Sequence, residues 1–70
     1  MNAQGQVTNI TERQREISAL VTEGLSNKQI ALRLNVSEGT IKIHLHNVYQ
    51  RVGVRGRTAL AAMLLRDKAE

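Results

Sequence analysis

Apolar residues recur at helical spacing along most of this chain, and residues 37–52 show the pattern most clearly. At about 100° per residue, four of them fall on one face of a helix, as expected for a surface that faces a core. These four are Ile41, Leu45, Val48 and Val52, with Tyr49 at the edge of the face. Ile43 points almost opposite Ile41, so a helix here exposes one isoleucine to solvent. An ordinary amphipathic helix with one exposed apolar residue also explains this pattern, because single exposed apolar residues are common.

Capping signals predict where the helices begin and end. Thr11 with Gln14, and Ser26 with Gln29, have the spacing of capping boxes, and Ser37 is a suitable N-cap for the helix after it. Stop signals that favour a left-handed backbone occur at Gly24, Asn35 and Gly53. We therefore expect helices at about 12–23, 27–34, 38–52 and 57–67.

The expected helices predict an all-α fold, a four-helix bundle. Only three residues separate the second helix from the third, so a tight turn is expected to connect these two helices. The chain has no Phe, Trp or Pro and a single Tyr, which leaves mainly aliphatic side chains for the core. Besides the face of 38–52, the inward-facing residues are expected to be Ile17, Leu20, Val21, Ile30, Ala31 and Leu34.

The last expected helix carries more apolar surface than packing on a small bundle requires. We expect the surplus to form a homodimer interface, although an Ala-rich segment is also simply a good helix former. The residues assigned to this interface are Ala61, Ala62 and Leu65.

Length and composition indicate one small domain. Its 70 residues include no cysteine, which excludes disulfides and thiolate metal sites, and no segment resembles a secretory signal or a membrane span. We expect a cytoplasmic protein without a membrane partner. Residues 1–9 carry no charged side chain or periodicity and are interpreted as a flexible leader or linker remnant, followed by the domain at 10–70.

Positive charge is concentrated in the middle of the chain. The formal net charge is +4, yet residues 26–57 hold six cations and one anion, a net charge of +5. The remainder is therefore slightly negative, at −1. Segregation of this kind suggests a polyanionic partner, although a solvated basic face has the same composition.

The exposed side of residues 38–52 has the chemistry of a DNA reader. Ile43 shares this side with His46 and Asn47, and Lys42 flanks it. Polar tips can bond to base edges in the major groove, an apolar tip can contact a thymine methyl group, and cations can meet phosphates.

Several motifs in fixed order resemble the LuxR-type helix-turn-helix domain, which ends FixJ-type and NarL-type response regulators and quorum-sensing regulators. The resemblance covers about residues 10–66. It rests on residues 11–17, 24–31, 34–37, 40–44 and 53–54, and on Arg57.

This resemblance implies a bacterial transcription regulator that binds double-stranded DNA with paired half-sites. It also implies that the regulator binds as a dimer held together by its fourth helix, and that RNA polymerase is a further partner. It further implies that the chain is the C-terminal effector domain of a two-component response regulator. By position, the base-reading residues would be Lys42, Ile43, His46 and Asn47. The phosphate-binding residues would be Ser26, Asn27, Lys28, Thr40, His44, Arg51 and Arg57.

Two histidines need separate comment. Many NarL-like members have lysine at the position of His46, so we expect DNA reading here to be weaker, to differ in sequence preference, or to depend on pH. His44 occupies a position where histidine is usual in this family, and both a structural role and a DNA contact fit it.

Nothing in the chain indicates catalysis. No nucleophile with a positioned base and no glycine-rich phosphate loop is recognisable. His44 and His46 are two residues apart and would point about 200° apart around a helix, so they cannot share a metal ion. We expect no enzyme activity, no cofactor and no small-molecule ligand. Two alternatives remain, a promoter-binding module like sigma-factor region 4 and a helical adaptor that binds protein through its last helix.

Overall fold

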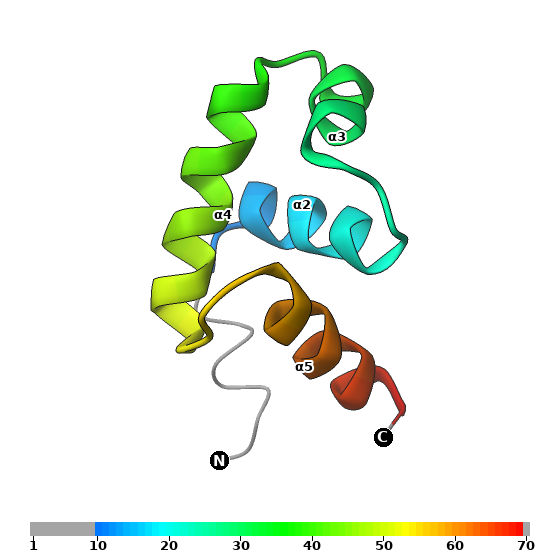
Figure 1. Cartoon of the computed structure of the whole chain (residues 1–70), viewed down its shortest axis with the longest axis vertical. Helices are drawn as coiled ribbons and strands as arrows, with labels where there is room; N and C mark the ends of the chain where they lie inside the picture. The colour runs from blue at the N-terminus through cyan, green and yellow to red at the C-terminus, as the bar shows by residue number, and fades with distance from the viewer. Residues whose placement is uncertain (1–9, 70) are drawn as a thin grey trace.

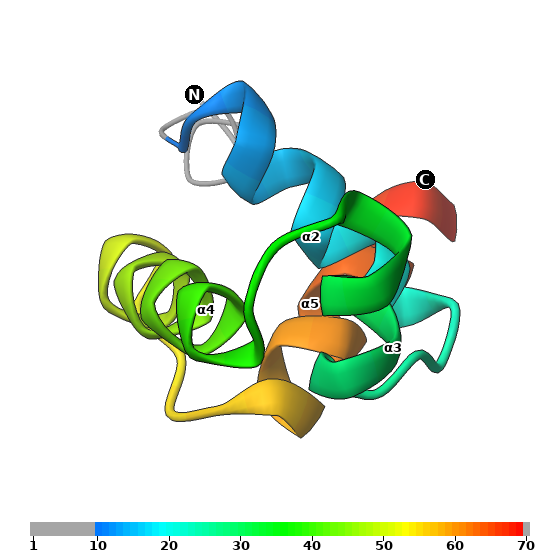
Figure 2. The same ribbon diagram turned by 90° about the horizontal axis from the view of Figure 1, so that it is seen from above.

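The computed structural model describes residues 10–69, which form four helices and no strand. These are α2 (Glu12–Thr22), α3 (Asn27–Leu34), α4 (Glu38–Val52) and α5 (Arg57–Ala69). Figures 1 and 2 show α4 lying along one side of the other three helices. The predicted all-α class is confirmed, and α5 extends two residues beyond its predicted end. Residues 1–9, interpreted above as a leader, lie outside the described residues.

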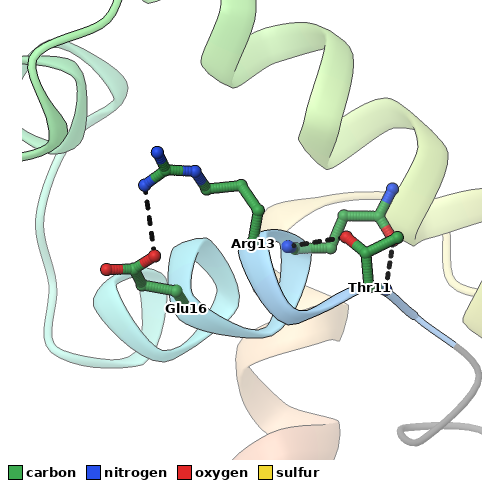
Figure 3. A network of polar contacts seen from close by, with 4 residues as sticks. Thr11, Arg13 and Glu16 are labelled. Carbon is green, nitrogen blue, oxygen red and sulfur yellow. Dashed lines mark hydrogen bonds and ion pairs between the residues drawn. The ribbon is translucent and has the colours of Figure 1, made fainter.

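The start of α2 is held by the predicted capping box (Figure 3). The amide of Gln14 donates to Thr11 Oγ1 at 3.1 Å, and the amide of Thr11 donates to Gln14 Oε1 at 3.0 Å. Two otherwise unpaired donors at the helix end are thereby satisfied. The neighbouring Arg13–Glu16 ion pair, at 3.1 Å, is exposed to water and contributes little to stability.

A residue with a left-handed backbone follows each of the first three helices, directly after α3 and α4 and one residue beyond the C-cap Glu23 in α2. The φ angles are 92° at Gly24, 61° at Asn35 and 79° at Gly53, as the sequence predicted. Glycine adopts this region without a steric penalty, and asparagine tolerates it better than most residues. The apolar residue after each stop packs against the core. These residues are Leu25, Val36 and Val54.

One hydrophobic core lies between the helices, and α2 packs against all three of the others. The predicted inward faces of α2, α3 and α4 are confirmed, because their apolar residues are buried or pack directly against the core. Ser18 is also buried, and its hydroxyl donates to the Gln14 carbonyl at 2.8 Å, so its polar group is satisfied. The buried apolar residues are Ile17, Leu20, Val21, Ile30, Ala31, Ile41, Leu45, Val48, Val52 and Leu60.

The turn between α3 and α4 fixes their relative orientation. Asn35 ends α3, the amide of Val36 donates to the Ala31 carbonyl at 3.0 Å, and Ser37 caps α4 at once. The two helices pack against each other, with the small side chain of Ala31 buried. This arrangement is a helix-turn-helix. Within residues 10–69, no helix is both long enough and apolar enough to cross a membrane.

Candidate nucleic-acid interface

The outer face of α4 presents four of the predicted site residues to solvent together. Lys42, Ile43, His46 and Asn47 are all exposed, and 65% of the Ile43 surface is accessible. The helix keeps this face away from the protein because its opposite face is buried in the core. Residues three or four apart on a helix are neighbours, so the four side chains make one continuous surface.

The N-terminus of α4 is held by Ser37. The amide of Thr40 donates to Ser37 Oγ at 3.0 Å, and the two hydroxyl oxygens lie 2.9 Å apart in a further hydrogen bond. Thr40 is half-buried, whereas Ser37 is exposed. The predicted phosphate contact Thr40 therefore lies beside the cap of α4, one turn before the outer face described above.

The N-terminus of α3 is built to accept an anion. Its capping box is complete, with Gln29 donating its amide to Ser26 Oγ at 3.1 Å and Ser26 donating its amide to Gln29 Oε1 at 2.8 Å. The first bond within the helix runs from the Ile30 amide to the Ser26 carbonyl at 2.9 Å. The amides of Asn27 and Lys28 precede this bond, so they point out of the helix end and favour negative charge there.

A shallow hollow brings several predicted phosphate contacts together at this helix end. Ser26 and Lys28 are exposed in it, while Asn27 and Arg57 are half-buried. Glu38, the first residue of α4, also lines the hollow, which the sequence did not lead us to expect. In the sequence, Glu38 could have been singled out because it is the only anion between residues 26 and 57. The lining residues are Gly24, Ser26, Asn27, Lys28, Glu38 and Arg57.

Arg57 is already engaged within the protein. Its guanidinium donates to Asn27 Oδ1 at 3.2 Å and to the carbonyl oxygen of Leu25. A direct bond to phosphate would have to use its remaining donors, since the guanidinium has five N–H groups in total. The structure therefore places this predicted phosphate contact between α5 and the start of α3.

The two other predicted phosphate contacts lie on α4. His44 is half-buried beside the buried Leu45, so it is less accessible than the outer-face residues. Arg51 is exposed in the last turn of the helix. At about 1.5 Å per residue, roughly 13 Å of helix separates Arg51 from Lys42, so the structure does not bring these two residues together.

The predicted dimer residues on α5 divide into two environments. Ala62 and Leu65 are exposed, with 51% of the Leu65 surface accessible, whereas Ala61 is half-buried and packs against the core. The surplus apolar surface of α5 is therefore narrower than the sequence suggested. Leu32 on α3 is more exposed still, at 74%, and the sequence analysis did not single it out.

No group of three His, Asp or Glu side chains that could hold a metal ion occurs in the described part of the chain. The surface residues instead combine cations, hydrogen-bonding tips and one exposed isoleucine around a helix-turn-helix. This fold and this surface define a DNA-binding domain of the helix-turn-helix class.

Comparison with known proteins gives the family. Residues 8–64 match the family described as bacterial regulatory proteins, luxR family. This match covers most of the chain, which therefore belongs to the luxR family. The predicted resemblance is confirmed, and so is the prediction that the chain is not an enzyme, because its relatives are transcriptional regulators.

Three individual relatives are named as regulatory proteins. The chain is 41% identical over 59 residues to the nitrate/nitrite response regulator protein NarP of Escherichia coli (strain K12), covering 84% of this chain and 27% of NarP. It is 39% identical over 61 residues to the transcriptional regulatory protein LnrK of Bacillus subtilis (strain 168), covering 87% and 28%. It is 32% identical over 62 residues to the nitrate/nitrite response regulator protein NarL of Escherichia coli (strain K12), covering 89% and 29%. The chain thus spans less than a third of the length of each of these relatives.

Proposed function

We propose that this chain reads a specific DNA sequence by placing α4 in the major groove. The observation that carries the proposal is the exposure of Ile43 in the middle of a polar and cationic face. In the described part of the chain, 65% of the Ile43 surface is accessible, and its neighbours Lys42 and His46 are exposed as well. An apolar contact with a thymine methyl group, flanked by hydrogen bonds to base edges, uses all of these side chains at once. Asn47 completes the reading surface.

The phosphate contacts follow from the same placement. The free amides of α3 and the side chain of Lys28 meet the backbone on one side of the groove, and Thr40 meets it near the start of α4. Arg51 meets it near the end of α4. His44 contributes from its half-buried position. Such contacts set the register of the domain on DNA and carry no base information themselves.

The larger context is also proposed. Two of the relatives named above are called response regulators, and all three are several times longer than this chain. We infer that the chain is the effector domain of a two-component response regulator that works in the cytoplasm. RNA polymerase is its proposed further partner during transcription.

Selection from a pool of random duplexes tests the proposal most directly. The purified chain should enrich duplexes that share a short motif, and for a dimer this motif should occur as paired half-sites. Failure to enrich any sequence, with the protein shown to be folded by circular dichroism, would contradict specific DNA binding.

Substitution of Lys42 and of Lys28 should separate base reading from phosphate binding. Lys42→Ala should relax base preference at one or two positions, by about 1 to 3 kcal/mol, because a base contact is lost. Lys28→Ala should weaken all sequences about equally, because phosphates are the same in every duplex. Binding of the selected duplex and of single-base variants, measured by fluorescence anisotropy, distinguishes these results. A uniform loss in both variants would show that α4 does not read bases.

We further propose that the chain forms a homodimer through α5, with Ala61, Ala62 and Leu65 at the contact. The exposed Leu65 and Ala62 form the open part of this surface, and Ala61 adjoins it.

Leu65→Glu should weaken self-association or cooperative DNA binding by about tenfold or more, because it places a charge in an apolar contact. Leu32→Glu is a matched control, since Leu32 is an exposed leucine on a different helix. Sedimentation equilibrium and circular dichroism give the association constant and confirm folding. An equal effect of both substitutions, or no effect of Leu65→Glu, would refute the assigned surface.

A further inference from the structure

Arg57 belongs to α5 in the sequence but bonds to the start of α3 in the fold. Its partners are the carbonyl oxygen of Leu25 and Oδ1 of Asn27, which precede it by 32 and 30 residues. The side chain is half-buried, and so are both partners. These two hydrogen bonds therefore join the first turn of α5 to both sides of the connection between α2 and α3.

The two acceptors lie at the ends of two different helices. Leu25 follows α2 and is tied to its end, because its amide donates to the Leu20 carbonyl at 3.2 Å. Asn27 is the first residue of α3. A planar guanidinium that bonds to both acceptors sets the direction of one relative to the other, whereas a lysine has one ammonium group at the end of a flexible stem. Arg57 thus bridges the end of the α2–α3 connection and the first residue of α3.

The start of α3 needs such support. The helix has only eight residues, fewer than the roughly 12 to 15 that an isolated helix requires, so its position depends on contacts with the rest of the domain. Its free amides at Asn27 and Lys28 attract an anion only in the direction in which the helix end points. A small rotation of α3 would turn these amides and the Lys28 side chain away from a phosphate held by the DNA.

We propose that Arg57 is a positioning residue for DNA binding, which aims the N-terminus of α3 at a phosphate through its bonds to Leu25 and Asn27. This inference rests on the proposed function, and it replaces the direct phosphate contact expected for Arg57 from the family resemblance. The two roles use different properties of the side chain. A direct contact needs the positive charge, whereas positioning needs the geometry of the guanidinium.

Arg57→Lys and Arg57→Gln separate charge from geometry. Lysine keeps the charge and loses the paired donors, so in the positioning role both variants should bind the selected duplex about tenfold more weakly than the parent chain. The slope of log affinity against log salt should become shallower by the same amount in both variants, because the phosphate contact that is lost is the one made by Lys28 at the start of α3, whether or not residue 57 keeps its charge. Lys28→Gln is the matched control, and the magnitude of its slope should decrease by about 0.9 because one phosphate contact is lost. Fluorescence anisotropy at several salt concentrations measures both quantities.

Amide hydrogen exchange of the chain without DNA gives a second readout. In Arg57→Lys, the hydrogen-bonded amides of Gln29 and Ile30 should exchange about tenfold faster than in the parent chain, while the core amide of Val48 should keep its rate. Faster exchange at all three positions would indicate general destabilisation and would overturn the inference. So would unchanged exchange at Gln29 and Ile30.

The binding outcomes distinguish the inference from the function on which it rests. If Arg57→Lys binds like the parent chain while Arg57→Gln loses affinity and salt slope, Arg57 is a phosphate contact and only the positioning role fails. If the parent chain itself binds no duplex, the proposed function fails and the inference fails with it. Equal loss of affinity and an equal change of slope in both variants, with faster exchange confined to the start of α3, support the positioning role.

Discussion

Raising the salt concentration from 50 to 200 mM is expected to weaken DNA binding by this chain by about 150-fold if it binds as a dimer. The proposed phosphate contacts include two exposed cations in each chain, Lys28 and Arg51. Each phosphate neutralised adds roughly 0.9 to the magnitude of the slope of log affinity against log salt, so the four cations of a dimer correspond to a slope of about −3.6. A single chain with two such contacts should lose only about 12-fold over the same range.

Fluorescence anisotropy with a labelled selected duplex measures this dependence. The steepness therefore reports both on the polyanionic partner and on the number of chains bound. The net charge of +5 between residues 26 and 57 makes some salt dependence inevitable for a DNA complex. A flat response would contradict DNA binding by this surface and would favour a partner held by the exposed apolar residues instead.

Replacing Ile41 by alanine is expected to lower the free energy of unfolding by about 2 to 5 kcal/mol. Ile41 is fully buried, with 0% of its surface accessible, so the substitution leaves a cavity in the core. A domain of this size has a total stability on the order of 5 to 15 kcal/mol, and the loss should lower the melting temperature by roughly 10 °C or more. Thermal and urea unfolding followed by circular dichroism measure both quantities.

Ile43→Ala is the matched control on the same helix. Its side chain is 65% exposed, so the free energy of unfolding should change by no more than about 0.5 kcal/mol. DNA recognition should instead lose preference at a thymine position, by about 1 to 3 kcal/mol. Equal destabilisation by the two substitutions would show that the buried and exposed faces of α4 are misassigned. Unchanged base preference in Ile43→Ala would remove the main support for major-groove reading.

Local signals explain why the helix boundaries could be predicted. Thr11 with Gln14, and Ser26 with Gln29, form their capping bonds within a single turn, so neither depends on the rest of the fold. The left-handed backbone at Asn35 follows in the same way from one residue and its neighbours. The spacing of apolar residues on α4 then separates its buried face from its exposed face, because a helix has a fixed period.

The candidate site was predictable only in part, for the same reason. Exposure of Ile43 follows from its position on α4, and it was expected. The neighbours of Arg57 were not, because the directions of α2, α3 and α5 all have to be known before its partners can be identified. Ala61 is a smaller example. The apolar residues of α5 occur on most sides of the helix, so the sequence alone does not identify its inward face. The packing shows that Ala61 faces the core while Leu65 faces solvent.

By itself, the sequence determined the four helices, the tight turn at Asn35, the outward face of α4 and the resemblance to the luxR family. Only the tertiary structure decided that Arg57 bonds to the connection between α2 and α3, and that Glu38 lines the hollow beside the start of α3. Capping bonds and helical periodicity act over a few residues, so they can be read along the chain. Contacts between residues that are distant in sequence depend on how all four helices pack together.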